Sequence, residues 1–140
     1  MTKIPTVYLA GPIAQRSDAQ CKDWRERANI LLPEFRILDP MVRDYRGQYD
    51  VAPFAKIVED DCTNILSSTA VLMNVETCGS WGTAMELRFA FERGTPIVGF
   101  SANPKEKEWK WFSPWVKFHL THYYPALEDA CIHLRTTYTI

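Results

Sequence analysis

The chain has little of what marks several large classes of protein. Its four cysteines, Cys21, Cys62, Cys78 and Cys131, are widely spaced and include no CxxC pair. This spacing argues against a zinc site or a disulfide framework and favours a reducing compartment. The 16 basic and 17 acidic residues leave a net charge of −1, so the sequence carries no electrostatic footprint for nucleic acid. No apolar stretch is long enough for a membrane span or a signal peptide. We expect a cytoplasmic protein whose partner is a small molecule.

Motifs for common cofactors and metals are also missing. Neither the dinucleotide fingerprint GxGxxG nor the phosphate-loop motif GxxxxGK[ST] occurs, which argues against a nicotinamide or triphosphate cofactor. The three histidines, His119, His122 and His133, show no ligand spacing with carboxylates or cysteines. We therefore expect neither a metal nor an organic cofactor.

Short apolar runs alternate with segments of helical periodicity along the whole chain. We expect one domain, residues 1–140, because this length forms a single ordinary core. The predicted strands are Thr6–Ala10, Arg36–Leu38, Ala70–Val75, Thr95–Phe100 and Thr121–Tyr124. The predicted helices are Asp18–Leu32, Pro53–Ser67, Thr83–Arg93, Ser113–Leu120 and Pro125–Leu134. Such alternation indicates an α/β fold with a parallel sheet between two layers of helices.

The segment CGSWGTAMELRFAF, residues 78–91, is the most informative part of the sequence. It places the carboxylate of Glu86 at a glycine-rich turn between an apolar strand and an amphipathic helix. In open parallel sheets, ligands bind beyond the carboxyl ends of the strands, where this turn lies. A structural alternative stays open, because Thr83 and Glu86 also have the spacing of a capping box at a helix start.

Two further polar residues stand among apolar ones. At 100° per residue, Asp61 falls within the apolar stripe formed by Phe54, Ile57, Val58 and Ile65. An ionised carboxylate there needs a partner, so Asp61 is either a functional group or a hydrated residue at the rim of a cleft. Tyr8, in the first strand, needs a partner for its hydroxyl group.

Several residues could bind a ligand that carries a phosphate group. Gly11, Gly79 and Gly82 allow close approach to the backbone, while Ser80, Thr83 and a helix N-terminus can bind an anionic oxygen. Arg43 and Arg46, in the polar loop Met41–Val51, could neutralise the charge, although loop arginines are more often simply solvated.

Four motifs in this order make the chain similar to the nucleoside 2-deoxyribosyltransferase family. They are Val7–Ile13 (VYLAGPI), Leu38–Pro40 (LDP), the helix with Asp61, and Gly82–Leu87 (GTAMEL). The superfamily also includes enzymes that hydrolyse the N-glycosidic bond of nucleoside 5′-monophosphates. The resemblance implies a flavodoxin-like, Rossmann-like sandwich with five parallel strands. It also implies a homodimer or larger assembly with active sites shared between subunits.

The resemblance also assigns roles to the candidate residues. It implies that the Glu86 carboxylate attacks the anomeric carbon and forms a covalent glycosyl-enzyme, as in retaining glycosidases. Asp61 would protonate or orient the departing base, and the Tyr8 hydroxyl group would hold Glu86. The implied substrate-binding residues are Gly11, Pro12, Ile13, Asp39, Arg43, Arg46, Gly79, Ser80, Gly82, Thr83 and His119.

The resemblance leaves the substrate branch open. Six residues before the nucleophile, transferases of free nucleosides commonly have an aspartate, whereas the nucleotide hydrolases have a serine, as here at Ser80. Against this, Pro12 stands where those hydrolases often have a serine. Trp115–His122 matches the segment given to the neighbouring subunit but lacks the usual asparagine, for which His119 or His122 could substitute. Two alternatives remain: a catalytically inactive nucleotide sensor or scaffold, and a structural protein in which Glu86 only caps a helix.

Overall fold

A computed structural model describes residues 3–139, so the two limits of the predicted domain, residues 1 and 140, lie outside it. Five strands form one parallel sheet in the order β2-β1-β3-β4-β5. Their bounds are β1 Thr6–Ala10, β2 Arg36–Leu38, β3 Ala70–Asn74, β4 Ile97–Phe100 and β5 His122–Tyr123. The predicted flavodoxin-like α/β fold with five parallel strands is confirmed.

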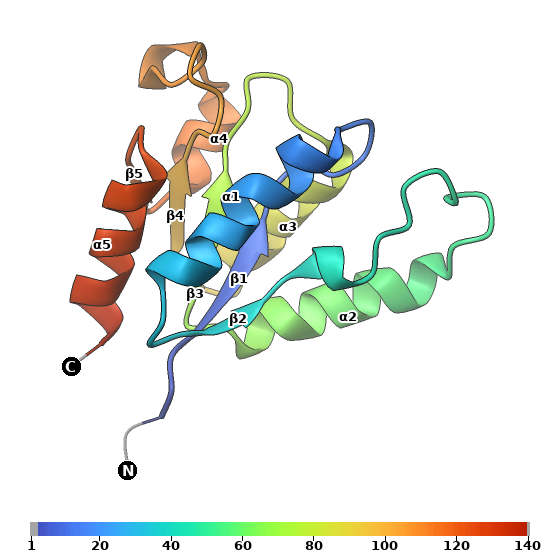
Figure 1. Cartoon of the computed structure of the whole chain (residues 1–140), viewed down its shortest axis with the longest axis horizontal. Coiled ribbons are helices and arrows are strands. Elements are labelled where there is room, and N and C mark those ends of the chain that lie inside the picture. The colour runs from blue at the N-terminus through green and yellow to red at the C-terminus, as the bar shows by residue number, and fades with distance from the viewer. Residues whose placement is uncertain (1–2, 140) are drawn as a thin grey trace.

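Helices cover both faces of this sheet (Figure 1). Their bounds are α1 Asp18–Leu31, α2 Phe54–Ser67, α3 Trp81–Glu92, α4 Pro114–His119 and α5 Leu127–Tyr138. The helices α1 and α5 contact each other on one face, while α3 contacts both α2 and α4 on the other. Among residues 3–139, no helix combines the length and the apolar character needed to cross a membrane.

Alternate residues along the strands belong to two separate hydrophobic cores, one on each face of the sheet. In β1, Val7 and Leu9 pack under α1 and α5 against Trp24 and Ala28. Tyr8 and Ala10 point to the other face and join the core under α2 and α3. The central strands are buried on both faces, which explains why they are almost continuously apolar in sequence.

The predicted elements all exist, but several boundaries differ. The helix predicted at Thr83–Arg93 begins earlier, at Trp81, and the last helix runs from Leu127 to Tyr138 rather than from Pro125 to Leu134. The edge strand β5 keeps only two residues, and short 3₁₀ helices lie at Pro40–Val42 and Trp109–Trp111.

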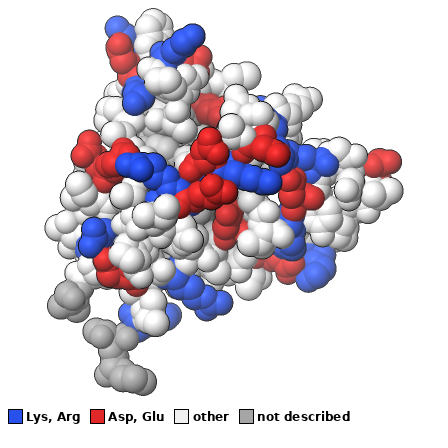
Figure 2. Space-filling view, viewed as in Figure 1, with Lys and Arg blue, Asp and Glu red and all other residues white. Residues whose placement is uncertain are grey.

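The topology fixes where a ligand can bind. The chain passes from β1 outward to β2 and then returns past β1 to β3, so the connections after β1 and β3 diverge. This divergence leaves a crevice beyond the carboxyl ends of β1 and β3. Acidic and basic side chains are intermixed on the face seen in Figure 2, without an extended region of one sign.

Candidate active site

A cavity of about 760 Å³ lies in this crevice. Its walls come from the connections after β1, β2 and β3 and from one side of α2 and α3. Nine of the predicted site residues line it: Gly11, Ile13, Arg43, Asp61, Gly79, Ser80, Gly82, Thr83 and Glu86. The structure thus brings together residues that are up to 75 positions apart in the sequence.

Glu86 lies in the second turn of α3, and Tyr8 of β1 lies directly beneath it. The fully buried Tyr8 hydroxyl group donates a hydrogen bond to Oε2 of Glu86. Burial raises the pKa of Glu86 to about 7, and the nearby Asp61 carboxylate adds to this rise. The bond from Tyr8 and the charge of Arg25 act in the opposite direction, because they stabilise the carboxylate. The pKa of Tyr8 is itself raised by burial and by Glu86, so its hydroxyl group keeps its proton.

The capping-box interpretation of Thr83 and Glu86 is wrong. Ser80, not Thr83, caps α3: its Oγ accepts a hydrogen bond from the Thr83 backbone N–H at 3.3 Å and donates one to the Thr83 hydroxyl oxygen at 2.9 Å. The helix therefore starts before Thr83, and the side chain of Glu86 bonds to Tyr8 instead of to the helix start. Helix capping does not explain why a carboxylate stands at position 86.

Asp61 faces the cavity from α2, and its side chain is 18% exposed. Arg43, in the loop after β2, reaches over to α2 and lies 3.2 Å from Asp61 Oδ1 and 2.5 Å from Asp60 Oδ2. Burial raises the pKa of Asp61, and the charge of Arg43 opposes this rise. Arg43 therefore serves as an ion-pair partner for two aspartates and also lines the cavity.

The apolar stripe around Asp61 lies mostly outside the core. Phe54 and Val58 are 80% and 60% exposed, and only Ile65 of the stripe is fully buried in the core. Ile57 and Val58 line the cavity beside Asp61. This part of α2 is apolar because it forms a wall of the cavity rather than a helix–sheet contact.

The connection between β1 and α1 contributes residues that the sequence analysis missed. Arg16 lines the cavity and is held by Glu76 Oε2 at 2.9 Å and by the carbonyl oxygen of Cys78 at 2.8 Å. Beside it, Gln15 adopts a left-handed backbone with φ of 60°, a conformation that is uncommon outside glycine and is often found at functional sites. The sequence signal that could have identified this loop as part of the site was an arginine, Arg16, shortly after the first predicted strand.

Four predicted binding residues lie elsewhere. Asp39 and Arg46 are outside the cavity wall: Asp39 lies 3.3 Å from Arg25, and Arg46 pairs with Asp18 and Asp44. Pro12 and His119 line an adjacent cavity of about 660 Å³ between α3 and α4.

His119, which the resemblance implies as a substrate-binding residue, is only 5% exposed. Because Arg88 can only donate to its Nε2, at 3.1 Å, the Nδ1–H of His119 donates to the carbonyl oxygen of Trp115. His119 is thus part of the wall between α3 and α4.

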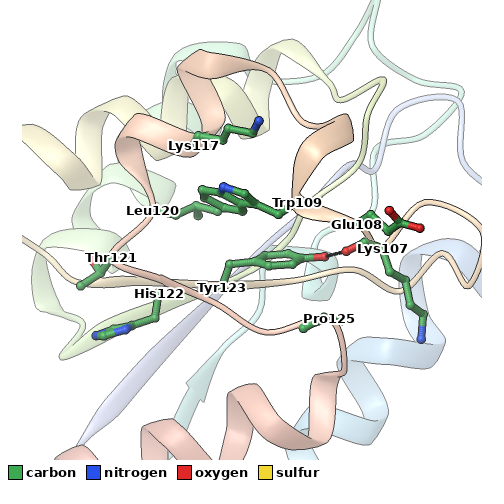
Figure 3. Close-up of a pocket in the computed structure, with 9 residues that line it drawn as sticks. All are labelled: Lys107, Glu108, Trp109, Lys117, Leu120, Thr121, His122, Tyr123 and Pro125. Carbon is green, nitrogen blue, oxygen red and sulfur yellow. Dashed lines mark hydrogen bonds between the residues drawn. The ribbon is translucent and has the colours of Figure 1, made fainter.

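A third cavity, of about 740 Å³, lies beside β5 and α4 (Figure 3). Figure 3 shows the rings of Trp109 and Tyr123 and the side chain of Leu120 in its centre, and the Tyr123 hydroxyl group bonds to the carbonyl oxygen of Lys107. It contains none of the predicted catalytic residues. The predicted catalytic carboxylates, Asp61 and Glu86, line the cavity beyond β1 and β3 instead.

The raised pKa of Glu86 makes a testable prediction about stability. Between about pH 4.5 and pH 7 the folded protein binds a proton at Glu86 that the unfolded chain releases, so the free energy of unfolding should fall as pH rises. Glu86→Gln removes this titration while keeping an acceptor for Tyr8. Since the pKa of Glu86 moves from 4.5 to about 7, the variant should gain up to about 3 kcal/mol at pH 8 relative to wild type.

Urea unfolding of both proteins at pH 5 and pH 8 measures this difference. Glu92→Gln, which alters an exposed carboxylate on the same helix, is the matched control. Identical pH dependence in wild type and Glu86→Gln would contradict the prediction.

Comparison with known proteins supports the fold. No protein-family model matches the sequence, and no curated protein has a similar sequence. A conserved protein from Enterococcus faecalis V583 has a similar structure, with a TM-score of 0.71 and 16% identity over 96% of this chain and 99% of that one. A 2-deoxyribosyltransferase from Leishmania mexicana gives a TM-score of 0.70 with the same identity and coverage.

A CMP N-glycosidase from Clostridium botulinum is similar as well. Its TM-score is 0.63 and its identity 14%, over 94% of this chain and 98% of that one. The chain therefore has a fold found in both a nucleoside deoxyribosyltransferase and a nucleotide N-glycosidase, as its motifs led us to expect.

Proposed function

We propose that the protein cleaves the N-glycosidic bond of a nucleoside or of its 5′-monophosphate, with Glu86 as the nucleophile. The observation that carries the proposal is the geometry of Glu86, which is held by Tyr8 and faces a cavity shared with Asp61. The fold supports it, since similar structures include enzymes of both kinds. No metal or organic cofactor enters the proposed chemistry.

The reaction has two steps. In the first, a carboxylate oxygen of Glu86 forms a bond to the anomeric carbon, the carbon–nitrogen bond breaks, and the base leaves with the electron pair. In the second, water or another base attacks the same carbon and releases Glu86. Because Tyr8 donates to Oε2, the other oxygen, Oε1, is the one left for the attack.

Asp61 supplies the proton that the leaving base needs. Its burial favours the neutral acid, but its contact with Arg43 favours the carboxylate. A substrate that binds between Asp61 and Arg43 would weaken their contact and so make the proton transfer easier.

The proposed mechanism makes a prediction about turnover. Glu86→Gln and Glu86→Ala should lower the rate of base release by roughly 1,000-fold or more, because no other group in the cavity replaces the nucleophile. Tyr8→Phe should cost roughly 100-fold, since it leaves Glu86 less well positioned. The measurement is chromatographic detection of free base from a panel of nucleosides and 5′-monophosphates, each with and without an acceptor base.

The same panel separates the alternatives. A nucleotide sensor or scaffold would bind a panel member without releasing base, and a structural protein would not bind at all. Normal turnover in Glu86→Ala would refute the mechanism even if the protein proves to be an N-glycosidase.

A 5′-monophosphate is the better candidate substrate. Ser80 caps α3 at the cavity wall, and the first backbone N–H groups of α3 lack partners within the helix. A helix N-terminus of this kind favours an anionic ligand. Arg16 lies in the same cavity and adds a positive group, although Glu76 neutralises part of its charge.

Ser80→Asp tests this preference. Aspartate keeps the helix cap but adds a negative charge that repels a phosphate group. The loss of kcat/KM should therefore be at least about tenfold larger for 5′-monophosphates than for free nucleosides. Ser80→Asn, which caps the helix without a charge, is the control. An equal loss for both substrate types in Ser80→Asp would argue against a phosphate site at Ser80.

The predicted homo-oligomer is also part of the proposal. Five large apolar side chains of α3 and α4 are exposed: Trp81 84%, Met85 64%, Phe91 38%, Trp115 76% and Phe118 66%. An exposed apolar surface beside the candidate site suits a contact with a second copy of the chain.

Trp115→Ser should shift the protein to monomers in sedimentation velocity and lower its activity. Trp111→Ser, which alters an exposed tryptophan outside both helices, should change neither. A wild-type protein that sediments as a monomer at high micromolar concentration would exclude the assembly.

A further inference from the structure

Asn74, the last residue of β3, carries a hydrogen-bond donor that the rest of the protein does not use. The residue is 2% exposed, and its Oδ1 accepts a hydrogen bond from the Ala102 backbone N–H at 2.9 Å. This bond fixes the orientation of the side-chain amide. Among residues 3–139, no group accepts a hydrogen bond from Asn74 Nδ2, and Nδ2 is not sealed inside the protein. Buried donors are almost always paired, so an unpaired one at a cavity indicates a bound group.

The cavity that Asn74 lines is the one of about 660 Å³ between α3 and α4. Thr83, which is 4% exposed, lines it as well. Because the Thr83 hydroxyl oxygen accepts a hydrogen bond from Ser80, its own proton remains to be donated, and no acceptor for it lies within the described part of the chain. Two nearly buried side chains from different elements therefore offer unused donors to the same cavity.

The charges in the wall of this cavity suit an anion. Of the described residues that line it, Arg88 is the one cation and Glu76 the one carboxylate. Glu76 is already paired, since Nε and Nη2 of Arg16 bind its Oε2 at 3.1 Å and 2.9 Å. The first backbone N–H groups of α3 add further donors and the positive end of the helix dipole.

The cavity continues the candidate active site on one side. Ser80 and three neighbours at the start of α3 line both cavities, whereas Asp61 and Glu86 line only the first. In the proposed reaction the base lies beside Asp61 and the anomeric carbon beside Glu86. The 5′ side of the sugar then faces Ser80, and a longer 5′ substituent extends past Ser80 toward Asn74.

We propose that the cavity between α3 and α4 binds a second phosphate group of the substrate, with Asn74 and Thr83 as its donors, so that the preferred substrate is a nucleoside 5′-diphosphate. The inference rests on the proposed function for the placement of base and sugar. A monophosphate reaches only Ser80, at the boundary between the cavities, and leaves the Asn74 donor unpaired. A diphosphate occupies both cavities.

The test is isothermal titration calorimetry on Glu86→Gln, which lacks the nucleophile and therefore leaves each nucleotide intact. The probes are the 5′-monophosphates and 5′-diphosphates of the common ribonucleosides and deoxyribonucleosides, and pyrophosphate alone. For the base that binds best, the diphosphate should bind at least about tenfold more tightly than the monophosphate, because it pairs the buried donors.

Asn74→Asp, made in the same background, identifies the residue responsible. Aspartate keeps an oxygen for the Ala102 N–H but replaces the donor with a negative charge, so the loss of affinity should be at least about tenfold larger for the diphosphate than for the monophosphate. Asn103→Asp is the matched control. Its Oδ1 also accepts a backbone N–H, that of Lys105 at 2.9 Å, but Asn103 lines neither cavity. The diphosphate preference should persist in this control.

Should Asn74→Asp fail to fold, Thr83→Val decides. Valine has a shape close to that of threonine but no hydroxyl group, so the preference for the diphosphate should shrink by at least about threefold. A preference of unchanged size in Thr83→Val would then overturn the inference.

Equal affinity for mono- and diphosphates in Glu86→Gln, or a preference that survives in Asn74→Asp, would also overturn the inference. Pyrophosphate that binds while no nucleotide does would overturn it too, because the anion would then be separate from the substrate. Calorimetry needs no turnover. A wild-type protein that releases no base from any nucleoside or nucleotide would therefore refute the proposed reaction without changing these binding results.

Discussion

The hydrogen bond from Tyr8 to Glu86 links β1 to α3, the helix that carries the candidate nucleophile. It places an ionisable carboxyl group where burial alone would keep it protonated. The surrounding structure acts on this balance: Asp61 favours the protonated form, whereas Tyr8 and Arg25 favour the carboxylate. A pKa of about 7 is the result of these opposing effects, and a group poised in this way can change its charge under physiological conditions.

Two cavities meet at the first turn of α3. Gly79, Ser80, Trp81 and Thr83 line both the candidate site and the cavity between α3 and α4. Because Ser80 caps the helix by bonds to Thr83, a ligand that competes for the Ser80 hydroxyl group would also disturb this turn. The candidate site and the cavity between α3 and α4 therefore share a few residues at the start of α3.

Much of the fold could be predicted from sequence because strands buried on both faces are continuously apolar and the intervening helices keep a regular period. The grouping of Tyr8, Asp61 and Glu86 followed from the motifs and from the rule that loops after parallel strands converge, although their roles are still predictions. The partners of charged residues could not be predicted. Nothing in the local sequence pairs Arg43 with Asp61 or Arg25 with Asp39, because these contacts arise only when distant segments pack. Periodicity also could not tell that Phe54 and Val58 lie outside the core.

The two-sided burial of β1 makes strand register a condition for the proposed function. Tyr8 reaches Glu86 only because its side chain points toward α2 and α3, while Val7 and Leu9 point toward α1 and α5. A shift of one residue in the pairing of β1 with β3 would reverse every side chain of the strand. Tyr8 would then enter the core beneath α1, and Val7 or Leu9 would face Glu86 without a donor. The pairing of Tyr8 with Val71 thus aligns both the backbone ladder and the candidate catalytic pair.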